Sequence, residues 1–129
     1  MARDQETLLS DSSFLVSETD AKGNIIFANE EFCRIAEYDA KDLIGKPHNI
    51  VRHKDMPKAA FQGLWDTINT GEVWHGYVKN STKSGGFYWV FATVYPFTNE
   101  KGELCYLSCR RKPSREDVKK YGDLYKTMS

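Results

Sequence analysis

The first part of the chain alternates between strand-like and helix-like patterns of apolar residues. Residues 14–19 (FLVSET) and 24–28 (NIIFA) are short apolar segments separated by a turn-forming stretch, and they predict a β-hairpin. Asn29 follows at the N-cap position of a short helix whose first turn is acidic. Phe32 and Ile35 lie on one side of that helix and indicate which side is buried.

A longer helix is predicted after residue 56, because Pro57 suits the first turn of a helix and apolar residues then recur on one face. Those apolar residues are Ala60, Phe61, Leu64, Trp65 and Ile68. Gly71 follows at the position where a helix commonly ends in glycine. A shorter helical turn is expected between Asp39 and Gly45.

From residue 74 onward the apolar pattern changes to the two-residue period of β-strands. Strands are predicted at residues 74–80, 87–97 and 104–110, and the intervening STKSGG and NEKGE segments are turn sequences. Pro113 ends the last strand. The S-x-x-D pattern at residues 114–117 then predicts the start of a terminal helix.

The order of the predicted elements is two strands, several short helices and three further strands. This order predicts an α+β fold with a mostly antiparallel five-stranded sheet and the helices gathered on one face. The helical region between the hairpin and the later strands would cover the sheet, and a ligand is expected in a cavity between these two layers. A chain of 129 residues without internal repeats is expected to form one domain.

Charge and cysteine content exclude several classes of function. Lysine plus arginine and aspartate plus glutamate number 18 each, so no net field favours nucleic acid or an anionic membrane. No run approaches the ~18 apolar residues of a membrane span, and the N-terminus lacks a signal pattern. Three cysteines without a CxxC motif indicate reduced thiols. We therefore expect a cytoplasmic protein without direct membrane insertion, which acts at a membrane only through a partner.

The strand predicted at residues 74–80 has one face that suits a flat ligand. Trp74, Gly76, Val78 and Asn80 share that face. An asparagine carboxamide donates and accepts side by side, which matches the edge of a flavin or pyrimidine-like ring, and a tryptophan can stack on such a ring. The glycine lets a group approach the backbone. The alternative is that Trp74 belongs to the core and Asn80 only begins the next turn.

Aromatic residues make up 13% of the chain, and much of this content lies in the last three predicted strands. Both faces of the strand at residues 87–97 are apolar, so its pattern does not reveal which face lines a cavity. Two covered faces would mean that a terminal segment or another subunit packs on the outer side of the sheet.

The segment KPHNIVRHKDMPKAAF, residues 46–61, contains two of the three histidines. His48 and His53 are five residues apart, without partners at a metal-binding spacing and without a nucleophile, so we expect neither a metal site nor a catalytic site. Arg52 and His53 precede the predicted helix, whose N-terminus favours phosphate. A flat-ring pocket beside such a segment suggests a nucleotide cofactor. Asp55 is expected to cap the helix, with a salt bridge to Arg52 as the alternative.

Two longer motifs, GKPHNIVRHKDMPKAAFQGLW and GEVWHGYVKN, give the chain a family resemblance. Together with the order of the elements, they resemble the FAD-binding PAS domain of aerotaxis receptors over about residues 10–110. The resemblance implies a PAS sensor domain at residues 13–112. An N-terminal cap segment at residues 1–12 would precede it, and a C-terminal helix at residues 113–129 would serve docking or signalling.

The same resemblance implies a function. In that family FAD is held non-covalently, and its redox state reports respiratory or oxygen status to a chemotaxis receptor. The residues of this chain at the family's FAD-binding positions are Asn29, Arg52, His53, Asp55, Trp74 and Asn80. The role of Asn29 rests on the resemblance alone, and contact between His48 and the cofactor stays open.

Receptors of this type continue into a membrane anchor and a signalling domain, which this sequence lacks. We therefore expect either an excised domain or a stand-alone PAS protein of a bipartite energy-taxis system, with a membrane-bound chemotaxis receptor as its partner and homodimerisation as an option. A haem-binding gas sensor and a cofactor-free interaction module are the alternatives. A light sensor is disfavoured because the segment after Gly45 has no cysteine to form a flavin adduct, and no enzymatic activity is expected.

Overall fold

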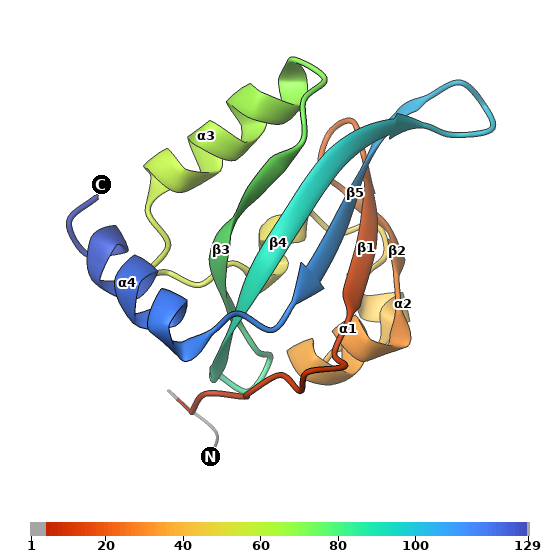
Figure 1. The fold of residues 1–129 in the computed structure, drawn as a ribbon. Helices are drawn as coiled ribbons and strands as arrows, with labels where there is room; N and C mark the ends of the chain where they lie inside the picture. The colour runs from red at the N-terminus through yellow and green to blue at the C-terminus, as the bar shows by residue number, and fades with distance from the viewer. Residues whose placement is uncertain (1–4, 129) are drawn as a thin grey trace.

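The computed structural model describes residues 5–128, which contain a five-stranded antiparallel sheet in the order β2-β1-β5-β4-β3 (Figure 1). The strands are β1 Leu15–Asp20, β2 Ile25–Ala28, β3 Trp74–Ser81, β4 Phe87–Thr98 and β5 Leu104–Arg111. The N-terminal hairpin and the three later strands therefore meet at the β1–β5 pair. The predicted α+β fold with its antiparallel sheet is confirmed.

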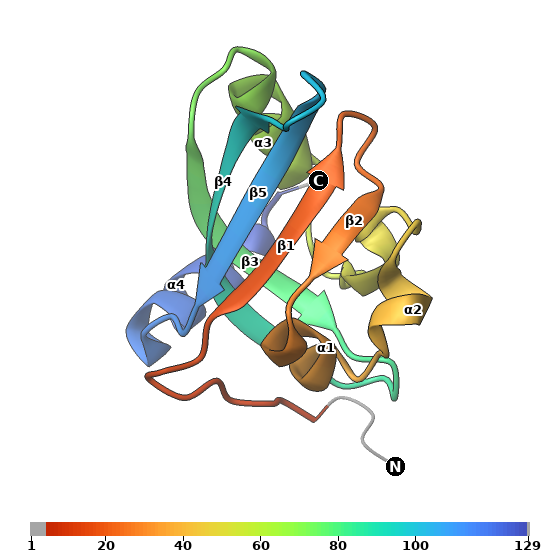
Figure 2. The same cartoon turned by 90° about the vertical axis from the view of Figure 1, so that its right-hand side faces the viewer.

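The described residues also form four α-helices and one 3₁₀ helix. They are α1 Glu30–Ala36, α2 Ala40–Leu43, the 3₁₀ helix η1 His48–Val51, α3 Lys58–Asn69 and α4 Arg115–Tyr125. The first four cover one face of the sheet, called here the inner face, whereas α4 lies against the other, outer face (Figure 1, Figure 2). The segment between β2 and β3 thus forms the predicted helical layer.

The core lies between the inner face and the short helices. Phe32 of α1, Leu43 of α2 and Val51 of η1 are buried and pack with residues of the sheet. The sheet residues in this cluster include Leu15, Ile25, Val78, Tyr88, Val90 and Ala92. Each large apolar side chain removed from water contributes about 1.5–3 kcal/mol, so this contact holds the helical layer on the sheet.

The outer face of β3 and β4 is covered by α4. The ring of Tyr77 stacks on Tyr121 with centroids 4.3 Å apart, and the Tyr77 hydroxyl donates to Asp117 at 2.9 Å. Tyr125 stacks near Trp89 and donates its hydroxyl to the Tyr77 carbonyl at 2.7 Å. The two apolar faces of β4 are therefore explained by a terminal segment on the outer side, one of the two arrangements expected from the sequence.

Two of the predicted helix caps are confirmed. The Asn29 side chain accepts a hydrogen bond from the backbone N–H of Phe32 at the start of α1. At the start of α4, the Ser114 hydroxyl accepts from the backbone N–H of Asp117 at 3.0 Å. Each cap satisfies a backbone donor that the first helical turn leaves without a partner.

The predicted cap of α3 by Asp55 is wrong. Pro57 occupies the N-cap position of α3 and makes no side-chain hydrogen bond there. Asp55 instead accepts from the Lys79 ammonium on β3 at 2.9 Å. Asp55 lies two residues before this N-cap position, and in its bond to Lys79 both partners are ionised, so the carboxylate turns towards β3.

The segment before β1 follows the start of β4. Glu6 forms a parallel bridge with Phe87, and Leu9 is buried in the core. The Glu6 carboxylate also accepts two hydrogen bonds from Arg115 of α4, at 2.8 and 3.0 Å. Of the segment expected at residues 1–12, the structure describes residues 5–12, and residues 1–4 lie outside the described part. Within residues 5–128 no helix is both long and apolar enough to span a membrane.

Candidate functional site

A cavity of about 270 Å³ lies between the inner face of the sheet and the η1–α3 segment. Its walls are mainly apolar, with side chains from α3, β3 and β4. These apolar residues include Leu64, Ile68, Trp74, Val78, Ala92 and Val94. The volume is close to the lower end of the ~300–1,000 Å³ typical of small-molecule sites. The structure therefore contains the predicted cavity, and all the residues of β3 and β4 that line it are even-numbered.

Backbone pairing brings Arg52 and Asn80 together at this cavity. Arg52 follows η1 and forms an isolated antiparallel bridge with Asn80 on β3. The Arg52 guanidinium lies 4.2 Å above the Phe61 ring and forms no ion pair with the described residues. The Asn80 carboxamide reaches the Tyr88 hydroxyl only with a geometry too poor for a standard hydrogen bond. Both side chains line the cavity with hydrogen-bonding capacity to spare.

Trp74 forms a wall of the cavity, with Gly76 beneath its ring. A Cβ atom added at Gly76 would lie 2.3 Å from two atoms of the indole, so only hydrogen fits there. Gly76 was predicted to let a group approach the backbone. In the structure, that group is the indole of Trp74. Trp74 also packs against both hydrophobic clusters. Core packing and cavity lining, the two alternatives for this residue, are therefore both found.

A buried polar cluster of Ser17, His48 and Arg110 lies on the β1–β5 side of the cavity. The Arg110 Nη2 donates to the Ser17 hydroxyl at 2.8 Å, and Nη1 donates to His48 Nε2 at 3.1 Å. The Ser17 hydroxyl lies 2.9 Å from the same imidazole nitrogen. The Arg110 guanidinium lies 4.2 Å above the Phe32 ring, which stacks on the His48 ring. His48 and Arg110 both line the cavity.

The cluster carries one positive charge. Burial, together with the Arg110 charge, lowers the pKa of His48 to about 3, so the imidazole is neutral at pH 7. Because arginine only donates, Nε2 of His48 is the acceptor. Burial lowers the pKa of Arg110 to about 10, which still leaves the guanidinium cationic. Burial raises the pKa of the Tyr88 hydroxyl to about 12 and keeps it neutral.

His53 and Asp55 lie beside residues of the outer face and do not line the cavity. The His53 ring contacts the edge of Phe87, and its Nδ1 accepts from the backbone N–H of Asp55 at 3.0 Å. Asp55 pairs with Lys79, as described above. After the Arg52–Asn80 bridge, the chain therefore turns around the β3 edge. The structure separates these two predicted cofactor residues from Arg52, Trp74 and Asn80.

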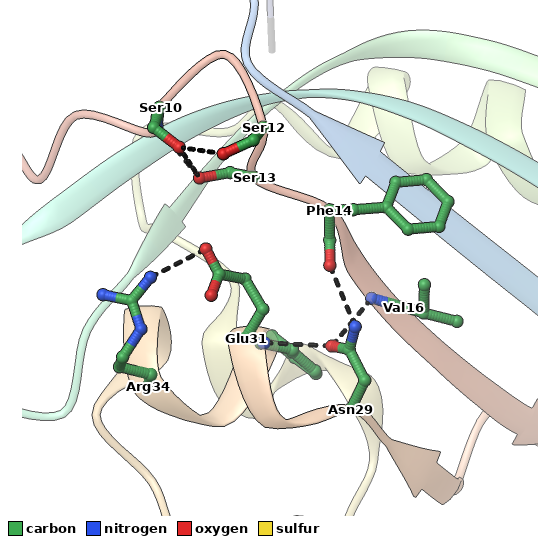
Figure 3. Close-up of polar contacts among 9 residues, drawn as sticks. Ser10, Ser12, Ser13, Phe14, Val16, Asn29, Glu31 and Arg34 are labelled. Carbon is green, nitrogen blue, oxygen red and sulfur yellow. Dashed lines mark hydrogen bonds and ion pairs between the residues drawn. The ribbon is translucent and has the colours of Figure 1, made fainter.

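Asn29 is the third predicted cofactor residue that does not line the cavity. Its side-chain oxygen accepts from the backbone N–H groups of Val16 and Phe32, each at 3.0 Å. Its side-chain nitrogen donates to the Phe14 carbonyl at 2.9 Å (Figure 3). Asn29 thus joins the start of α1 to the start of β1, a role that uses both ends of its carboxamide.

Sequence reasoning missed Ser17 and Arg110 and left His48 open. These three residues form one cluster only because β1 pairs with β5 and η1 lies over that pair. Ser17 and Arg110 are 93 residues apart in the chain. The available signal was alternation in β5, where Tyr106, Ser108 and Arg110 share one face. The described residues contain no group of three or more His, Cys, Asp or Glu side chains that could hold a metal ion.

The fold and the cavity can be compared with known proteins. Residues 25–110, which include β2, β3, β4, the whole helical layer and all of β5 except its last residue, match the family model described as the PAS fold. This chain belongs to the PAS family. The PAS chain is 42% identical to the aerotaxis receptor of Escherichia coli (strain K12) over 125 residues, which is 97% of this chain and 25% of the receptor.

A second relative is the nitrogen fixation regulatory protein of Klebsiella oxytoca, 33% identical over 106 residues. That match covers 81% of this chain and 21% of the regulator. The PAS chain thus spans about a quarter or less of the length of these curated relatives.

Solved structures of light-oxygen-voltage (LOV) domains share the fold. A domain studied with a flavin analogue superposes with a TM-score of 0.73 at 17% identity, over 85% of this chain and 84% of that one. The dark structure of the blue-light photoreceptor Aureochrome1 LOV gives a TM-score of 0.70 at 19% identity, over 86% and 80% of the two chains. At these identities the likeness supports the PAS fold alone.

Proposed function

We propose that this PAS domain is a redox or energy sensor that binds FAD non-covalently in the cavity and signals by conformational change to a chemotaxis receptor. The observation that carries the proposal is the cavity bordered by Trp74, Asn80 and Arg52, in a chain 42% identical to an aerotaxis receptor. The proposal includes a cytoplasmic location, a membrane-bound receptor as partner and an option to form homodimers. It includes no enzymatic turnover.

The residues around the cavity fit a flavin. The apolar walls suit a flat ring, and the Asn80 carboxamide offers a donor and an acceptor to the polar edge of that ring. Arg52 offers a cation without an ion-pair partner among residues 5–128, which suits a phosphate. We assign direct contact with the cofactor to these residues and to Trp74. Asn29, His53 and Asp55 would support the site from outside by fixing the segments that form it.

When bound, a flavin ring supplies reversible electron uptake, which changes its charge and its hydrogen-bonding capacity. The protein's part is to hold the ring, to exclude water and to respond to that change. Asn80 can respond because its carboxamide forms no standard hydrogen bond with the side chains of residues 5–128. The Val78 and Ala92 side chains keep the inner face apolar, which strengthens any polar contact made there.

Strand β3 connects the cavity to the surface. Asn80 and Trp74 face the cavity, while Tyr77 of the same strand holds α4 through Asp117 and Tyr125. A shift of β3 that follows a change at Asn80 would therefore alter the packing of α4 against the outer face of the sheet. Because packed elements change position in discrete steps, such a shift can change the surface that a partner contacts.

Haem is the alternative cofactor, because His48 lines the cavity and an imidazole is a common haem ligand. The geometry disfavours it. The His48 Nε2 already accepts from Arg110 at 3.1 Å and lies 2.9 Å from the Ser17 hydroxyl. An iron ligand at this nitrogen would have to displace both contacts. An intense Soret absorption band in the purified protein would favour haem.

The identity of the cofactor is tested by denaturing the purified protein and separating what it releases by chromatography. We expect FAD. Release of FMN or haem would contradict the choice of cofactor. A protein that releases nothing and takes up no added FAD would overturn the proposed function.

The Arg52→Ala variant tests where the phosphates bind. An arginine bonded to phosphate contributes about 1.5–3 kcal/mol, so FAD affinity should fall about tenfold or more, whereas riboflavin affinity should change less than about twofold. Titration of flavin fluorescence measures both. Lys54→Ala, which removes an exposed cation from the same segment, is the matched control and should bind FAD like the parent. Equal losses for FAD and riboflavin would place Arg52 beside the ring instead.

A further inference from the structure

Arg110 carries a buried positive charge that no acidic side chain within residues 5–128 neutralises. The residue is 2% exposed, and its guanidinium contacts Ser17, His48 and the Phe32 ring. None of these three groups is negatively charged. The Nε hydrogen of Arg110 is buried without an acceptor. Removing a charge from water is costly unless an opposite charge or a full set of hydrogen bonds compensates it, and here that compensation is incomplete.

Other basic side chains of the protein, unlike Arg110, form ion pairs with carboxylates. Lys79 pairs with Asp55, and Arg115 pairs with Glu6 through two short hydrogen bonds. The electrostatic partners of Arg110 that favour its charge are Tyr88 and Cys109, and neither is a carboxylate. Within residues 5–128, Arg110 therefore has no negatively charged side chain beside it. Arg110 lines the cavity, so a negatively charged group bound in the cavity could lie beside its guanidinium.

We propose that Arg110 stabilises negative charge on the ligand of the cavity, and that for a flavin this is the reduced ring bearing a single negative charge. The proposal deepens the proposed function and rests on it. An external reductant that adds one electron without a proton, or two electrons with one proton, leaves the ring with that charge. No covalent bond to the protein forms or breaks.

This role separates Arg110 from the residues that hold the oxidised cofactor. The oxidised ring is uncharged, so the Arg110 charge favours the reduced ring over the oxidised one. Arg110 therefore raises the midpoint potential and contributes little to the affinity for oxidised FAD. Ser17 and His48 are positioning residues, because they accept hydrogen bonds from the two Nη atoms and so fix the guanidinium at the cavity wall.

The test compares Arg110→Met and Arg110→Lys with Arg111→Met. Arg111 is the matched control, because it is adjacent in sequence, exposed, and positioned over Phe14 away from the cavity. Two quantities are measured for each protein: the midpoint potential by spectroelectrochemical titration and the dissociation constant of oxidised FAD. We expect Arg110→Met to reduce the ratio of reduced to oxidised flavin at least tenfold at a fixed potential, which is 59 mV for a one-electron couple.

The affinity of Arg110→Met for oxidised FAD should stay within about threefold of the parent's affinity. The midpoint potential of Arg110→Lys should lie close to that of the parent, and the midpoint potential of Arg111→Met should equal it. An unchanged potential in Arg110→Met would overturn the proposal, and so would an equal loss of affinity for both oxidation states, which indicates a merely structural role. A parent protein that binds no flavin would instead overturn the proposed function, and this role with it.

A second measurement needs no cofactor. Because Arg110→Met removes an incompletely compensated buried charge, the thermal unfolding midpoint of its FAD-free form should equal or exceed that of the FAD-free parent. A clear fall would show that the guanidinium serves the fold itself, contrary to the proposal. If the methionine variant cannot be produced, Arg110→Gln, which is neutral but can still donate to Ser17, provides the same comparison of potentials.

Discussion

The two faces of β3 differ in whether their polar groups find partners within the protein. On the outer face, Tyr77 donates to Asp117 and Lys79 donates to Asp55. On the inner face, the Asn80 carboxamide reaches only the Tyr88 hydroxyl, with poor geometry, and faces the cavity. One strand therefore separates contacts that hold the fold from groups available to a ligand. Outer-face substitutions should change stability, and inner-face substitutions should change ligand affinity.

The largest effect is expected for Tyr77→Ala on the outer face. The change removes the ring contact with Tyr121 and the hydrogen bond to Asp117. Because the side chain is only half-buried, the free energy of unfolding should fall by about 2–3 kcal/mol, less than for a core aromatic. Urea denaturation measures this loss. The control is His75→Ala, an exposed neighbour, which should lower the free energy of unfolding by less than about 0.5 kcal/mol. A larger effect of Tyr77→Ala on FAD binding than on stability would contradict the comparison.

The inner face should behave in the opposite way in Asn80→Ala. Loss of the carboxamide should weaken FAD binding by about 1.4–2 kcal/mol, or about tenfold to thirtyfold, because one or two hydrogen bonds to the ring are lost. The free energy of unfolding without FAD should change by less than about 1 kcal/mol. Titration calorimetry and urea denaturation provide the two numbers. Ser81→Ala, the adjacent residue of β3, is the control and should leave both unchanged.

A smaller and mixed effect is expected for Gly76→Ala. The new methyl group would lie 2.3 Å from the Trp74 indole, so the ring must move. We expect a loss of stability of about 1 kcal/mol and a several-fold loss of FAD affinity, with a shift in tryptophan fluorescence. Gly63→Ala in α3 is the control, because nothing lies within 4 Å of its Cβ position. That control should stabilise the helix by about 0.4–1 kcal/mol.

The smallest effect concerns the Asp55–Lys79 pair. The hydrogen bond from Lys79 lowers the pKa of Asp55 below its value in the unfolded chain. The pair therefore contributes stability above the unfolded pKa of about 3.9 and loses that contribution as pH falls through the folded pKa. Asp55 is 57% exposed, so the contribution at pH 7 should stay below about 1 kcal/mol.

Asp55→Asn measures this contribution. The variant should be slightly less stable than the parent at pH 7, and the two denaturation curves should converge at the lowest pH where both still fold. A difference that persists unchanged into the acidic range would mean that the carboxylate acts through packing or hydrogen bonding and not through its charge.

Much of the fold could be predicted because its signals are local. The caps at Asn29 and Ser114 depend on residues three positions apart, and the two-residue period of β3 to β5 is visible within each strand. The faces of β3 were also predictable, since alternation alone places Trp74 and Asn80 together. These local signals do not say which strands pair, and so they could not place β1 beside β5.

The rest of the candidate site depends on that pairing. Ser17 and Arg110 meet only through the β1–β5 register, so no local pattern marks them as neighbours. Arg52 and His53 show the opposite situation, in which neighbours in sequence lie apart in the fold. Both are predicted to contact the cofactor from their charge ahead of α3 and from the family resemblance, but consecutive residues of an extended segment point in opposite directions. With Arg52 lining the cavity, His53 faces Phe87 and the outer side.

The short segment that contributes Arg52 also protects an exposed edge of the sheet. Strand β3 is an edge strand, and its free backbone groups meet the Arg52 bridge and the Met56 sulfur, which accepts from the Lys79 N–H at 3.3 Å. An unprotected edge strand is a template for pairing with another chain. A protein whose Arg52 segment loosened on losing its ligand would therefore also lose its protection against edge-to-edge aggregation.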